Sequence, residues 1–162
     1  MTDAKPVSTP IDKSTKMVKA MSPSSKGEIE ETREIPYQNA IGSLMYASIG
    51  THPDITHAVC QASQFANNPG RQHRIAVKRI LRYLKGTISL KLKFTRSSDT
   101  SLKVFCATDW GSDEEDRRFY TGYLFALANT AVSWVSRKQP TVALFTTEAE
   151  FMALTETSKE VL

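Results

Sequence analysis

RQHRIAVKRILRYLKGTISLKLKF, residues 71–94, contains the change of periodicity that decides the fold. Its first part repeats apolar residues at the three- and four-residue spacing of one helical face: Val77, Ile80, Leu81 and Leu84. Gly86 is a typical helix end. After Gly86 the apolar residues alternate with polar ones, as in a strand: Leu90, Leu92 and Phe94. The stretch therefore predicts a helix over residues 71–86 followed by β-structure.

Two further helices are expected before this stretch. The first begins near Tyr37 and has an apolar face: Ile41, Leu44, Met45 and Ile49. The second begins at Pro53 and ends at Asn68-Pro69-Gly70, with a face of its own: Ile55, Val59, Ala62 and Phe65. Residues 36–87 thus predict a small helical unit. Residues 1–35 combine three prolines with many Ser, Thr, Lys and Glu residues, which predicts a disordered linker.

Three more strand patterns follow the stretch: LKVFCATDW at 102–110, FYTGYLFAL at 119–127 and AVSWVS at 131–136. A final helix is expected from Thr146 or Thr147, with an apolar face: Ala149, Met152, Ala153 and Leu154. Short strands joined by turns indicate an antiparallel meander, so residues 88–162 predict an α+β domain with one C-terminal helix. Because no stop signal precedes Leu162, we expect this domain to be incomplete.

Composition allows several functions and excludes few. The chain has 162 residues, 40% apolar and 23% charged, which suits one soluble domain or two small ones. A pI near 9.1 permits polyanion binding without requiring it. The sequence shows neither a secretion signal nor an apolar run long enough for a membrane, so the residues alone predict an intracellular protein. Cys60 and Cys106 are expected as small core residues rather than a disulfide.

The helix expected at residues 71–86 carries six basic residues and no acidic one: Arg71, Arg74, Lys78, Arg79, Arg82 and Lys85. Such a face can follow a phosphate backbone, because each neutralised phosphate releases counterions. The alternative interpretation is a solvated surface. The six cations repel one another, and no acid three or four residues away relieves that repulsion, which is unusual for a solvated helix. Both interpretations therefore stay open.

Several blocks of the chain, in order, resemble the end of the Pol polyprotein of copia-type retrotransposons. They are KPVSTP at 5–10, IPYQNAIGSLMYASIGTHPDI at 35–55, FANNPGRQHRIAVKRILRYLKGT at 65–87, TGYLF at 121–125 and VSWVSRKQPTVALFTTEAEFMAL at 132–154. The resemblance implies that the helices before Gly86 correspond to the connection after reverse transcriptase. The remainder then corresponds to the first part of ribonuclease H.

Ribonuclease H uses a cluster of carboxylates to hold two Mg²⁺ ions. Family members resemble one another in a block like YTDADWAGD, whose first Asp bridges the metals, whereas this chain reads VFCATDWGSD at 104–113. The resemblance places Ala107 at that Asp and matches Glu150 to the family's helical carboxylate. Asp109 is the nearest substitute, and the other family acids would follow Leu162. The resemblance therefore implies a non-catalytic chain without a metal or another cofactor.

Other conspicuous side chains have structural interpretations. Glu148, Glu150 and Glu156 are expected as solvated helix acids. Trp110 and Trp134 are expected in a core or at a strand edge. The three histidines, His52, His57 and His73, lack a metal-ligand spacing and are expected to be incidental.

A second resemblance concerns two short motifs. Arg79-Ile80-Leu81-Arg82 and the downstream Glu114-Glu115-Asp116-Arg117 resemble the RxLR and dEER signature of secreted oomycete effectors. It implies secretion, entry into the nucleus or cytoplasm of a host plant cell, and suppression of defence-related cell death by binding a host protein. The same RxLR residues belong to a copia-like block. We predict an effector of this kind, the alternative being an inactive copia-type fragment with weak, non-specific nucleic-acid binding and no membrane contact.

Overall fold

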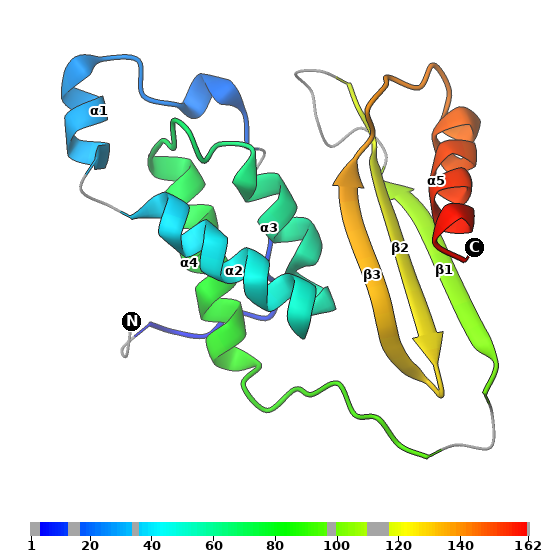
Figure 1. Cartoon of the computed structure of the whole chain (residues 1–162). Coiled ribbons are helices and arrows are strands. Elements are labelled where there is room, and N and C mark those ends of the chain that lie inside the picture. The colour runs from blue at the N-terminus through cyan, green and yellow to red at the C-terminus, as the bar shows by residue number, and fades with distance from the viewer. Residues whose placement is uncertain (1–3, 13–16, 34–35, 97–99, 110–116, 162) are drawn as a thin grey trace. The chain divides into compact units, whose positions relative to one another are not determined.

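The chain forms two compact units, Met1–Leu90 and Lys91–Leu162. The computed structural model describes residues 4–12, 17–33, 36–96, 100–109 and 117–161. Within these ranges it contains α-helices and one three-stranded antiparallel sheet, so the predicted α+β class is confirmed (Figure 1).

The first unit is built on three packed helices (Figure 1). They are α2 (Tyr37–Gly50), α3 (Thr56–Ser63), preceded by the short η2 (Pro53–Ile55), and α4 (Arg71–Gly86). Their shared core contains buried apolar residues of all three helices, including Ile41, Val59 and Ile80. The helix predicted at residues 71–86 has the same bounds in the structure. Leu81 and Leu84 pack against the core as expected.

The predicted inner face of α2 is partly wrong. Met45 and Ile49 are 42% and 72% exposed, whereas the buried residues of this helix are Tyr37, Ile41, Leu44 and Ser48. The apolar residues of α2 cover two adjoining faces, and periodicity alone does not choose between them. Tyr37 fixes the observed choice, because its hydroxyl donates a hydrogen bond to the Ala62 carbonyl at 2.8 Å. Burial raises the pKa of Tyr37 to about 12.

The N-terminal residues do not behave as the expected linker. The described parts of residues 1–35 contain η1 (Lys19–Met21) and α1 (Lys26–Arg33). Val7, Ile11 and Met17 are partly buried against the helical core. The linker prediction was based on average composition, which hides a few apolar residues spaced to reach one surface. For residues 7, 11 and 17 it is wrong.

The second unit is a meander with one helix (Figure 1). The strands β1 (Leu102–Asp109), β2 (Tyr120–Leu127) and β3 (Thr130–Lys138) pair in the order β1-β2-β3, and α5 (Thr146–Val161) packs on β1 and β2. Ala128 and Asn129 connect β2 to β3 with positive φ angles of 50° and 62°, which is the conformation of a tight hairpin turn. These three strands and the final helix are confirmed.

Three details of the chain after α4 differ from expectation. Residues 89–94 form no strand, and Leu90 and Phe94 are 64% and 68% exposed, because alternation yields a strand only where a partner supplies ladder hydrogen bonds. In α5 the buried residues are Ala149, Ala153 and Thr157, while Leu154 is exposed. Neither cysteine forms a disulfide, as expected, but Cys106 is exposed and is not a core residue.

Candidate functional site

The start of α4 is fixed by a buried histidine. His73 is fully buried, and its ring stacks on Phe65 with 3.9 Å between the centroids. Its Nδ1 accepts a hydrogen bond from the Gly70 N–H at 3.0 Å. The proton therefore lies on Nε2, which donates to the Val18 carbonyl at 3.2 Å. The expectation that His73 is incidental is wrong, because this side chain links α4 to the residues before η1.

The inner face of α4 determines where its cations lie. Val77, Ile80 and Tyr83 are buried, so the basic residues occupy the other side of the helix. The Tyr83 hydroxyl donates to Asp54 Oδ2 at 2.8 Å and holds the helix against η2. Burial, and then the hydrogen bond to Asp54, raise the pKa of Tyr83 to about 12.

Six cations form a row on this outer side, which we call the basic row: Arg71, Arg74, Lys78, Arg79, Arg82 and Lys85. The row extends over roughly 21 Å, from a rise of about 1.5 Å per residue. Arg71, Lys78 and Lys85 are exposed, and the other three are half-buried. Arg74 donates to the Pro69 carbonyl at 3.4 Å. The structure thus brings all six predicted residues together on one helix face.

Residues 4–12, which we call the strap, lie along the C-terminal half of the basic row. Arg82 Nε donates to the Lys5 carbonyl at 2.6 Å, and Lys85 Nζ donates to the Ala4 carbonyl at 2.9 Å. Arg79 donates to both the carbonyl and the hydroxyl of Thr9, at 3.2 and 2.9 Å. It also lies 3.3 Å from the Asp12 carboxylate. Sequence reasoning missed the strap entirely.

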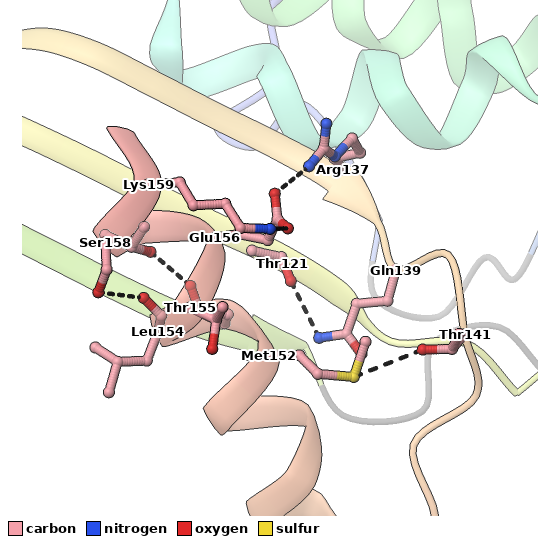
Figure 2. A network of polar contacts seen from close by, with 12 residues as sticks. Thr121, Arg137, Gln139, Thr141, Met152, Leu154, Thr155, Glu156, Ser158 and Lys159 are labelled. Carbon is pink, nitrogen blue, oxygen red and sulfur yellow. Dashed lines mark hydrogen bonds and ion pairs between the residues drawn. The ribbon is translucent and has the colours of Figure 1, made fainter. Parts of the chain in front are cut away.

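The residues matched to ribonuclease H lie in the second unit and do not converge. Gln139 Nε2 donates to Thr121 Oγ1 and to the Ala149 carbonyl, so Thr121 lies on the α5 side of the sheet (Figure 2). Thr108 pairs directly with Thr121 and shares that side. Ala107 and Asp109, the neighbours of Thr108, therefore lie on the side away from α5. Glu150 is exposed and lies one turn after the start of α5, beyond Glu148 of the first turn.

The other acids of α5 have structural partners. Glu156 forms ion pairs with Arg137 and Lys159 (Figure 2). The distances are 2.6 Å and 2.8 Å. The hydrogen bond from Lys159 is the main cause that lowers the pKa of Glu156. Glu148 accepts the Leu144 N–H at 2.7 Å, just before the helix begins. Among the residues that the structure describes, no three His, Cys, Asp or Glu side chains are grouped to hold a metal ion.

Comparison with known proteins identifies the family. The chain is 48% identical, over all its 162 residues, to the retrovirus-related Pol polyprotein from transposon TNT 1-94 of Nicotiana tabacum. It is 37% identical over 161 residues to the corresponding polyprotein from transposon RE1 of Arabidopsis thaliana. The chain belongs to the Pol family of copia-type retrotransposons. It spans only 12% and 10% of the length of these two polyproteins.

A shorter relative of this Pol segment has a different name. The segment is 45% identical over 130 residues, 80% of its length, to Secreted RxLR effector protein 161 of Plasmopara viticola, and covers 92% of that protein. No protein-family model matches the segment, and no solved structure is similar to it. In the described parts of the Pol segment, no helix is both long and apolar enough to span a bilayer.

The RxLR residues of the Pol segment are part of a folded helix. Ile80 is 1% exposed and Leu81 packs on the core, while both arginines donate to the strap. An accessible, extended motif would leave these side chains available to a receptor. Glu114, Glu115 and Asp116 of the dEER-like motif lie outside the described residues, as do Trp110 and Asp113, and Arg117 has a φ of 53°.

Proposed function

We propose that this copia-type Pol segment binds the phosphate backbone of nucleic acids through the basic row, without sequence preference and without cleaving it. The observation that carries the proposal is the charge of α4. Six cations lie on one face of a helix that has no acid, and Asp12 forms an ion pair with one of them. Like charges so placed repel one another, and an extended polyanion would relieve that repulsion.

The shape of the row favours a nucleic acid over a single phosphate. Neighbouring cations are three or four residues apart, except for the adjacent Lys78 and Arg79, so they form a line of roughly 21 Å rather than a pocket. A line of cations meets many phosphates weakly and reads no base edges. We therefore expect weak binding whose strength depends steeply on salt.

The side chains at the positions matched to the ribonuclease H site disfavour cleavage. Mg²⁺ takes oxygen ligands, and the methyl group of Ala107 offers none. Asp109 is a poor substitute, because β1 directs it to the side of the sheet away from α5, the helix that carries Glu150. The described residues that the resemblance matches to the metal site therefore do not fit a two-metal centre, and the proposed function includes no cleavage.

A labelled RNA/DNA hybrid tests both parts of the proposal. In fluorescence anisotropy at low salt the hybrid should bind. A plot of the logarithm of the binding constant against the logarithm of the salt concentration should be a falling line, with a slope of about −0.9 for each neutralised phosphate. Lys78→Glu combined with Lys85→Glu should weaken binding on the order of tenfold, because two phosphate contacts become repulsive. With Mg²⁺ present the hybrid should remain uncut on a denaturing gel.

The matched control is Lys91→Glu combined with Lys93→Glu, which changes the net charge equally but lies outside α4. If both pairs weaken binding to the same extent, the effect comes from overall charge and the basic row is not the interface. Absence of binding at low salt would contradict the proposal outright. Metal-dependent cleavage that disappears in Glu150→Ala would show that the segment is catalytic.

The relative named as an effector supports a second candidate, an effector that binds a host plant protein. Expressed inside plant cells without a signal peptide, the chain should then reduce induced cell death. Glu150→Ala should make no difference, and neither should Arg79→Ala with Arg82→Ala, because the motif's supposed role is delivery. Absence of suppression by the intact chain would rule out this candidate. If the double arginine variant is folded and abundant but no longer suppresses cell death, Arg79 and Arg82 belong to the surface that binds the host protein.

A further inference from the structure

The strap places oxygen atoms where a bound phosphate backbone would place its own. The donors of Arg79, Arg82 and Lys85 are met by three backbone carbonyls, one hydroxyl and one carboxylate. In the proposed function, the same side-chain nitrogens donate their hydrogen bonds to phosphate oxygens. The strap therefore resembles, in its hydrogen bonding, the ligand of the surface that it covers.

The two halves of the basic row differ in access. Arg71 and Lys78, toward the start of α4, are exposed and make no ion pair with a described residue. Arg79, Arg82 and Lys85 are held by the strap. A polyanion can reach the first half directly, but the second half only if the strap leaves.

We propose that the strap, residues 4–12, is an internal competitor that must be displaced before a nucleic-acid duplex engages Arg79, Arg82 and Lys85. This inference rests on the proposed function and adds its regulation. The segment has a closed form, in which the first half of the basic row alone meets phosphates, and an open form in which the whole row does. Displacement lengthens the interface without a change in α4 itself.

Phosphate can displace the strap because the exchange of partners favours it. Carbonyl oxygens are neutral, whereas phosphate oxygens are charged, so the same arginine and lysine donors gain Coulombic attraction and counterion release when phosphate replaces the carbonyls. The cost of opening is the loss of the Asp12 ion pair and the exposure of Val7 and Ile11, which are partly buried against the helical core. Since both terms are modest, the closed form weakens duplex binding without abolishing it.

A reversible lock on the strap tests the inference in the full chain. A Cβ added at Gly86 would lie 3.1 Å from the Pro6 Cβ, so Pro6→Cys with Gly86→Cys can form a disulfide after a shift of a few tenths of an ångström. The background carries Cys60→Ser and Cys106→Ser, because neither natural cysteine is in a disulfide and either thiol could pair with an introduced cysteine. Oxidation locks the strap, and a reductant releases it.

Anisotropy with a labelled 20-base-pair RNA/DNA hybrid should distinguish the two states. The oxidised protein should bind about tenfold more weakly at low salt, and its salt slope should be smaller by about 2 to 3, the contribution of three cations at roughly 0.9 each. Gly86→Cys alone in the same background should not respond to oxidant. In the unmodified chain, adding the hybrid should increase amide hydrogen exchange over residues 4–12.

Each other outcome has a definite meaning. Equal affinity and slope in the two redox states would overturn the competition while leaving the proposed function intact. Tighter binding by the oxidised state, or protection of residues 4–12 from exchange by the hybrid, would make the strap part of the interface and overturn the inference. Absence of binding in both states would defeat the proposed function and the inference together.

Discussion

Replacing Gly70 with alanine should lower the free energy of unfolding of the first unit by about 2 to 3 kcal/mol, as expected for overpacking. The added Cβ would lie 1.8 Å from the Met21 carbonyl oxygen and 2.9 Å from its carbonyl carbon. Both are backbone atoms and cannot rotate away. The end of η1 must therefore move, and the nearby hydrogen bond from His73 to Val18 should be lost with it.

Urea unfolding followed by far-ultraviolet circular dichroism measures this loss. Gly42→Ala is the matched control, because a Cβ there meets nothing within 4 Å, and inside α2 it should stabilise by about 0.5 to 1 kcal/mol. Gly70 has φ −81° and ψ 177°, which alanine adopts freely, so the contact alone causes the expected loss. Stabilisation by Gly70→Ala would show that the N-terminal residues do not approach α4 this closely.

Replacing His73 should have the second large effect. His73→Phe keeps a ring beside Phe65 but leaves the Gly70 N–H and the Val18 carbonyl without their partner. Each buried polar group left unsatisfied costs about 1 to 3 kcal/mol, so we expect a loss of about 2 kcal/mol or more. His73→Ala adds a cavity and should cost about 3 kcal/mol or more.

The same unfolding experiment, with tryptophan emission as an internal reference, separates the two units. Both tryptophans, Trp110 and Trp134, belong to the second unit, so their transition should not move in His73 variants. His57→Ala is the control, because His57 is only half-buried and contacts Gln61 on its own helix. Wild-type stability in His73→Phe would mean that the stacked ring, and not its hydrogen bonds, holds the start of α4.

The sequence was most informative where a local pattern determines structure. The bounds of α4 followed from apolar spacing and from Gly86, and the three strands followed from alternation. The inner face of α2 did not, because Met45 and Ile49 are as apolar as the residues that pack. Residues 89–94 alternate without a partner strand, and sequence alone cannot supply one.

The candidate site was predictable in its residues but not in its partners. Six cations without an acid were visible in the sequence, and the structure places them on one face. The strap was not predictable, because Arg82 meets a carbonyl 77 residues away and every residue type carries such a carbonyl. His73 had only a weak local signal, its place three residues after Gly70 at the start of a helix. The side of the sheet on which Ala107 lies could be assigned only from the pairing register of β1 with β2.

The strap's reliance on main-chain acceptors gives it unusual tolerance to mutational drift. Ala4 and Lys5 contribute carbonyl oxygens, which remain when their side chains change. Two strap side chains also contact the row, since the Thr9 hydroxyl and the Asp12 carboxylate both bind Arg79. Two lineages of this segment can therefore differ in sequence at most strap positions and still hold the three cations by the same carbonyl hydrogen bonds, provided that the backbone path is preserved.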